Sequence, residues 1–222
     1  MRKLISGIVE FRRNVRAGYQ EAFSKLALTQ MPDALFISCS DSRVVPNTFA
    51  STNPGDLFVL RNVGNLVPEC DENGVSFSDE SEAAAIEFSV LNLKVNDIIV
   101  CGHSECGAMH ALLNNREKMP HLNLKKWLRH GDESLAIFNE GLTLDPNISA
   151  VNQLSQINVI TQMKHVATYP IVKERILNGT LRVHGWWFDI THADVYSFDE
   201  EKNKFVIIDE TEAERLYTIF KN

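Results

Sequence analysis

Three residues of this sequence have the side chains of metal ligands. Cys39 begins residues 39–43, and His103 and Cys106 lie together within residues 103–107. Two thiolates and one imidazole form a donor set that suits zinc, and three protein ligands leave one tetrahedral position open. Catalytic zinc sites keep such a position, whereas structural sites close it with a fourth protein ligand. The number of ligands therefore favours an enzyme.

Asp41 stands two residues after the first cysteine and has two possible roles. Its carboxylate can fill the fourth position on the metal, which shuts the site. Alternatively, Arg43 can hold the carboxylate in a bidentate grip, which is strong and orienting, so that Asp41 steers a water at that position. An ordinary structural ion pair between Asp41 and Arg43 is a further reading, favoured if the cysteine were not adjacent.

Each ligand cluster directly follows a short apolar segment. Residues 34–38 precede Cys39 and residues 97–101 precede His103, and both segments are typical of buried strands. In open α/β sheets, ligands bind in the crevice outside the carboxyl ends of the strands. We therefore expect the two clusters, distant in sequence, to meet at one edge of a sheet.

The remaining elements alternate between strand and helix patterns. Strands are expected at 34–38, 56–61, 97–101, 181–190, 193–198 and 204–208, and helices at 2–27, 81–93, 108–113, 122–129, 151–168, 171–177 and from 211 onward. Gly18 weakens the first helix and could divide it in two. The pattern predicts an α/β fold, with a central, mainly parallel sheet flanked by helices, an N-terminal helical arm and antiparallel edge strands.

Composition limits the classes of protein to consider. A length of 222 residues with 44% hydrophobic residues suits a single domain over residues 1–222. The net charge of −7, without a long basic run, disfavours a nucleic-acid partner. No apolar run approaches the roughly 18 residues of a membrane span. Four cysteines, two of them in the ligand pattern, do not resemble a secreted disulfide framework, so we expect a cytoplasmic protein.

These motifs together resemble the β-class carbonic anhydrases. The resemblance rests on residues 39–43, 54–56, 61–65 and 101–107, and extends from the N-terminal helix to the strand that contains His184. It implies reversible hydration of CO₂ to bicarbonate, with one Zn²⁺ per subunit. The roles carried over are zinc ligation by Cys39, His103 and Cys106, and a catalytic dyad of Asp41 and Arg43. In this mechanism the dyad orients a zinc-bound hydroxide that attacks CO₂.

The family exists in two forms, and three positions bear on the choice between them. The form that closes its site at low pH binds bicarbonate in a regulatory pocket through a Trp, an Arg and a Tyr. This chain keeps Arg61 at the Arg position but has Phe36 and Phe188 at the other two. Because two anchors lack their polar groups, we expect the pocket to be absent. The open, plant-type form is the better match.

The resemblance also assigns substrate-binding residues and an assembly. Gln30 matches a glutamine that donates a hydrogen bond to substrate, while Phe58, Val63, Phe88 and Gly107 match apolar or small positions around CO₂, with Phe88 in place of a Tyr. The three apolar residues among them could equally be ordinary core. The family implies a homodimer or homotetramer in which residues 1–27 form an arm at a subunit interface, so that Gln30 could act across that interface.

The sequence is also compatible with two other functions. The same zinc hydroxide could hydrolyse a CO₂ analogue such as COS or CS₂, with selection by the access channel. A non-catalytic zinc protein, permanently closed by Asp41, belongs to a different class, and Arg43 counts against it because it offers Asp41 another partner. A Rossmann-type nucleotide binder is excluded, since no G-x-G-x-x-G motif follows a strand.

Overall fold

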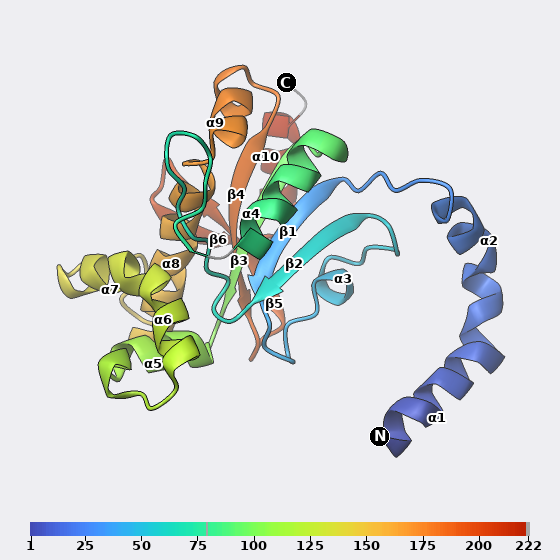
Figure 1. Ribbon diagram of the computed structural model, residues 1–222, viewed down its shortest axis with the longest axis horizontal. Helices are drawn as coiled ribbons and strands as arrows, with labels where there is room; N and C mark the ends of the chain where they lie inside the picture. Colours follow the sequence, from blue (N-terminus) through green and yellow to red (C-terminus); the bar gives the residue numbers. More distant parts are fainter. Residues whose placement is uncertain (79, 221–222) are drawn as a thin grey trace.

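A single six-stranded sheet forms the body of the protein (Figure 1). The computed structural model describes residues 1–78 and 80–220. The strands are β1 (Ala34–Cys39), β2 (Leu57–Asn62), β3 (Asp97–His103), β4 (Arg182–Asp189), β5 (Asp194–Asp199) and β6 (Lys204–Ile207). Their order is β2-β1-β3-β4-β5-β6. Strands β1 to β4 pair in parallel, and β5 and β6 add antiparallel pairs at one edge.

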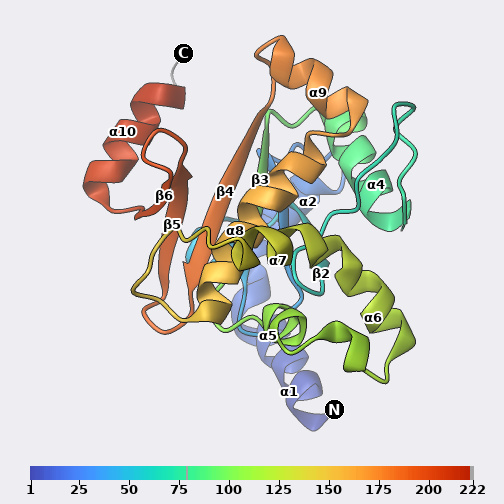
Figure 2. The same ribbon diagram turned by 90° about the vertical axis from the view of Figure 1, so that its left-hand side faces the viewer.

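Helices cover both faces of this sheet. They are α1 (Arg2–Glu10), α2 (Arg16–Leu26), α3 (Pro46–Phe49), α4 (Glu80–Glu87), α5 (Gly107–Leu113), α6 (Leu122–Leu128), α7 (Asp132–Asn139), α8 (Ala150–Val166), α9 (Pro170–Leu177) and α10 (Glu210–Phe220). Two π-helical turns (Phe11–Val15 and Phe88–Asn92) and two 3₁₀ turns (Arg116–Lys118 and Arg129–Gly131) complete the helical segments. Helices α4, α8 and α9 lie on one side of the sheet, and α10 lies on the other (Figure 2).

The central strands are continuous apolar runs because both of their faces are covered. Every residue of β1 is buried, and β3 is buried from its second residue onward. On one face Leu35 and Ile98 join the cluster that packs under α4, α8 and α9. On the other face Phe36 and Ile99 join a second cluster. Burying each such side chain contributes about 1.5–3 kcal/mol, and this burial fixes the register that positions the strand ends.

The predicted fold class is confirmed, including the parallel centre, the antiparallel edge and the helical arm. Two helices, α3 and α7, were not predicted. The arm is divided, but not at Gly18, which lies within α2. A π-helical turn at Phe11–Val15 separates α1 from α2 instead.

The N-terminal arm extends away from the body (Figure 1). No residue of α1, α2 or the turn between them is buried. Large apolar side chains are exposed along it, among them Leu4, Ile8, Phe11, Tyr19 and Phe23. Within the described part of the chain, no helix has the length and apolar character needed to cross a membrane.

Candidate metal centre

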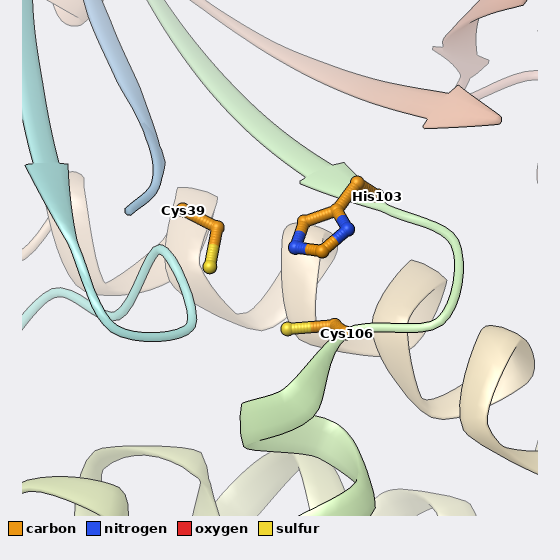
Figure 3. A group of neighbouring side chains, drawn as sticks. All are labelled: Cys39, His103 and Cys106. Carbon is orange, nitrogen blue, oxygen red and sulfur yellow. The ribbon is translucent and has the colours of Figure 1, made fainter. Parts of the chain in front are cut away.

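The three predicted ligands meet at the carboxyl edge of the sheet. Cys39 ends β1, His103 ends β3, and Cys106 immediately precedes α5. The strands pair in parallel with Ser38 opposite Cys101, so their carboxyl ends reach the same level. The donor atoms all lie within 4.8 Å of one another, and all three residues are buried. Figure 3 shows both sulfurs and one ring nitrogen turned toward a common space.

The imidazole of His103 is arranged as a ligand would be. Its Nδ1 lies 2.8 Å from the carbonyl oxygen of Ser104, and because a carbonyl only accepts, Nδ1 carries the proton. Nε2 therefore presents a lone pair toward the sulfurs. This atom is buried and has no hydrogen-bond partner among the described residues. Buried polar atoms are rarely left this way, and a metal ion at this point would satisfy it.

The sulfur of Cys39 has the thiolate character that zinc requires. The backbone N–H of Gly64 donates to Cys39 Sγ at 3.3 Å. The pKa of Cys39 is lowered to about 4, chiefly because Cys106 hydrogen-bonds to it, and the bond from Gly64 adds to the effect against burial, which raises the pKa. In turn, the pKa of Cys106 is raised, because its hydrogen bond to Cys39 and its burial both favour the thiol. The donor set therefore fits a soft divalent cation such as zinc.

Asp41 lies beside these donors but is held by Arg43. Arg43 Nε donates to Asp41 Oδ1 at 3.0 Å, and Nη2 donates to Oδ2 at 2.7 Å. This grip holds the pKa of the Asp41 carboxyl well below its usual range. Asp41 Oδ2 is only 4.0 Å from His103 Nε2. Arg43 Nη2 also donates to the carbonyl of Glu105 at 3.1 Å, which ties the dyad to the loop between His103 and Cys106.

A pocket of about 280 Å³ opens beside Cys39 and Asp41. Its lining residues are Cys39, Ser40, Asp41, Val63, Gly107, Ala108, Ala111, Leu124 and Leu128. Apart from Ser40 and Asp41, these offer mostly carbon to the cavity. Ala111, Leu124 and Leu128 were not predicted as site residues. Their apolar helical spacing is the same signal that marks any packed helix, so nothing in the pattern singles them out as site residues.

The structure brings only some of the predicted substrate residues to this pocket. Val63 and Gly107 line it. Phe58 and Phe88 pack against each other instead, with ring centroids 5.8 Å apart, and Phe88 is 41% exposed. Gln30 is exposed in the segment between α2 and β1. Within one chain, these three residues are therefore not part of the pocket.

Phe36 and Phe188, expected to replace polar anchors, belong to an aromatic cluster. Phe49 stacks on Phe188 with ring centroids 4.6 Å apart, and the edge of Phe36 meets Trp186 at 5.8 Å. Phe36 is fully buried, and Phe188 is 7% exposed. The two phenyl rings thus fill their positions with carbon and offer no hydrogen-bonding group to an anion.

The carboxyl edge of this mainly parallel sheet carries two cysteine sulfurs and one histidine nitrogen that could hold a metal ion. This arrangement is typical of metal-dependent enzymes, which hold their ion by three protein ligands. Comparison with known proteins gives the family. The family described as "Carbonic anhydrase" matches residues 34–195. The chain belongs to the carbonic anhydrases, in their β class.

Individual relatives match over nearly the whole chain. A carbonic anhydrase of Pseudomonas aeruginosa is 36% identical over 212 residues, covering 95% of this chain and 93% of the relative. The solved β-carbonic anhydrase CcaA is 34% identical with a TM-score of 0.86, covering 95% of this chain and 92% of that one. One structure described among two tetrameric β-carbonic anhydrases of Sordaria macrospora is 31% identical with a TM-score of 0.76, covering 88% and 95%.

Proposed function

We propose that this protein catalyses the reversible hydration of CO₂ to bicarbonate and a proton at a zinc ion held by Cys39, His103 and Cys106, one per subunit. The observation that carries the proposal is the bare Nε2 of buried His103, facing two sulfurs within 4.8 Å. When bound, zinc supplies Lewis-acid chemistry that brings the pKa of a coordinated water to about 7. The remaining chemistry belongs to Asp41, Arg43 and the pocket.

Asp41 is proposed to orient the attacking water. Its carboxylate, kept ionised by Arg43, accepts a hydrogen bond from the nucleophile and so directs a lone pair of the oxygen toward the substrate carbon. The Asp41 side chain is 17% exposed, so a proton released there lies close to solvent. Arg43 holds the carboxylate through two hydrogen bonds, which restrain its rotation.

The neighbouring pocket suits a small nonpolar substrate. CO₂ has no net dipole, and the walls formed by Val63, Ala108 and Leu124 give it an apolar environment next to the nucleophile. The aromatic packing of Phe36 and Phe188 supports the open form, because it leaves no polar side chain at two of the three anchor positions of the regulatory pocket. We therefore propose that Asp41 stays with Arg43 and does not close the site.

A second copy of the chain is proposed to complete the site. The arm at residues 1–27 exposes apolar side chains that this single-domain chain does not itself cover, which supports a subunit interface there. Gln30, which follows the arm, and the neighbouring rings of half-buried Phe58 and exposed Phe88 would then contact substrate in a homodimer or homotetramer. Four unpaired cysteines support a cytoplasmic location.

Replacing Gln30 by Ala tests this assignment. The variant should lower the rate of CO₂ hydration while leaving the zinc content unchanged, because Gln30 is assigned to substrate and not to metal. Zinc analysis and stopped-flow kinetics on the same preparation measure both quantities. Loss of zinc in the variant would refute the assigned role.

Stopped-flow CO₂ hydration by the zinc-replete protein tests the function itself. We expect a rate that rises with pH as the nucleophilic water loses its proton, and that is high at about pH 8.5, above a pKa of about 7. No rate above buffer at this pH would exclude the proposal. A parallel assay with CS₂ compares specificity constants, and a larger constant for CS₂ than for CO₂ would reassign the substrate.

A further inference from the structure

Arg61 on β2 reaches across to the segment that carries Cys39 and Asp41. Its Nε and Nη2 donate to the carbonyl oxygen of Cys39 at 3.1 and 2.9 Å. Nη2 donates a second time, to the carbonyl oxygen of Asp41 at 2.7 Å. The parallel register pairs Ser38 with Arg61, which places this side chain level with the end of β1. One guanidinium therefore grips the backbone on both sides of Ser40.

These bonds restrain Asp41 from a direction that Arg43 does not cover. Arg43 holds the carboxylate, whereas Arg61 holds the peptide behind it. The N–H of Ser40 adds a bond to the carbonyl of Asn62 at 2.8 Å. Because Asp41 Oδ2 is only 4.0 Å from His103 Nε2, a small rotation of the Asp41 backbone would carry the carboxylate in among the three donor atoms. Such a backbone rotation would break the bond from Arg61 Nη2 to the Asp41 carbonyl.

The same bonds leave Arg61 poorly suited to bind an anion. A guanidinium grips a carboxylate-like anion through two N–H groups on one edge. Nη2 forms one edge of the guanidinium with Nε and another with Nη1, and it already donates to two carbonyls. The arginine that the family resemblance links to a regulatory bicarbonate is thus engaged with the protein's own backbone.

We propose that Arg61 is a positioning residue that keeps Asp41 paired with Arg43 and outside the space between Cys39, His103 and Cys106. The inference rests on the proposed function, in which Asp41 orients the attacking water. An inward rotation of Asp41 would prevent this. Loss of the Arg61 guanidinium frees the carbonyls of Cys39 and Asp41, and the carboxylate then becomes the fourth ligand of the metal.

The test compares Arg61→Met, which keeps an unbranched apolar stem, with Arg61→Lys, which keeps one charged donor. Arg175→Met is the matched control. Arg175 also grips backbone carbonyls, those of Val90 and Val95 at 3.2 and 3.0 Å, but it does so from α9. All variants are full-length proteins, loaded with zinc for kinetics and with Co²⁺ for visible spectra, with azide as a small-anion probe of an exchangeable metal position.

We expect Arg61→Met to keep its metal, to lose about 10- to 100-fold in kcat/KM, and to show a cobalt spectrum that no longer responds to azide. Arg61→Lys should recover part of both losses. Adding Asp41→Asn to Arg61→Met should restore the azide response without restoring the rate, because an amide is a poor ligand in place of the carboxylate. Arg175→Met should respond to azide as the unmodified protein does.

The inference is overturned if Arg61→Met keeps the azide response, if it loses its metal, or if the double variant stays unresponsive. It is also overturned if bicarbonate inhibits the unmodified enzyme and Arg61→Met relieves that inhibition, because Arg61 would then be an anion anchor. An unmodified protein without CO₂ hydration would instead refute the proposed function. The cobalt spectra would still report on Arg61 in that case.

Discussion

At both ends of the parallel strands an arginine grips an aspartate beside a histidine, but the two histidines differ. At the amino end, Asp97 accepts from Arg182 Nε at 2.8 Å and from His184 Nε2 at 2.7 Å. At the carboxyl end, Asp41 and Arg43 form the same fork. There, however, the nearest histidine nitrogen is 4.0 Å away and has no hydrogen-bond partner among the described residues.

The difference shows what makes one of these ends a metal site. At the amino end the Asp97 carboxylate accepts a hydrogen bond from His184 Nε2. At the carboxyl end the carbonyl of Ser104 accepts a hydrogen bond from Nδ1 of His103, which leaves Nε2 facing the sulfurs of Cys39 and Cys106. The combination of aspartate, arginine and histidine does not by itself separate the two ends. An unsatisfied buried nitrogen next to soft donors does.

Removing each histidine should give the largest contrast. His103→Ala should lose its metal and nearly all CO₂ hydration, because two thiols remain where three donors stood. His184→Ala should keep both, since its ring bonds to Asp97 at the opposite end of the sheet. Metal analysis after dialysis, together with the hydration rate, measures the contrast. Equal metal retention by the two variants would contradict the expected difference between the two ends.

Neutralising each aspartate should give a smaller contrast, confined to rate. Asp41→Asn should retain metal but lose about 100-fold or more in kcat, because the amide cannot orient the nucleophile as an ionised acceptor does. Asp97→Asn should stay within about twofold of the unmodified rate. Steady-state kinetics on zinc-replete proteins measures both. A similar loss of rate in the two variants would mean that Asp41 acts through structure alone.

The smallest effect should appear in the stability that Asp97 contributes at the amino end. Burial pushes the pKa of Asp97 upward, but hydrogen bonds from His184 and Arg182 outweigh it and hold the pKa at about 2. Because this lies below the unfolded value of about 3.9, ionised Asp97 stabilises the fold above about pH 4. That contribution is lost as the pH falls from about 4 to about 2.

Asp97→Asn should therefore lower the free energy of unfolding by about 1–2 kcal/mol at pH 7, after allowing for solvent screening of this half-buried cluster. The difference from the unmodified protein should shrink as the pH approaches 2. Urea unfolding of both proteins at several pH values measures it. A difference that does not change with pH would show that packing, rather than the charge on Asp97, stabilises this end.

The sheet and the metal ligands could be predicted because strong local signals coincide. The apolar runs of β1 and β3 end directly at Cys39 and His103, and parallel strands bring their carboxyl ends to one edge. Helix α7 was missed, although Asp132 and Glu133 in its first turn are a favourable start signal. His184 lies within β4, and its bond to Asp97 gives it a structural role.

Other parts of the site could not be predicted for physical reasons. The bonds from Arg61 end on backbone carbonyls, which every residue possesses and which therefore leave no mark in the sequence. Gln30, Phe58 and Phe88 match substrate positions by resemblance, yet no spacing rule says whether such side chains act in their own chain or in a neighbouring one. Because these residues do not line the pocket within one chain, their role depends on how the chains assemble.

The most direct test of the central claim is a crystal structure of the zinc-loaded protein near pH 8. We predict zinc bonded to Cys39, His103 and Cys106, with the Asp41 carboxylate on Arg43 and outside bonding distance of the metal. An Asp41 oxygen at about 2.0–2.2 Å from the zinc would contradict it, because the site would then be closed by four protein ligands.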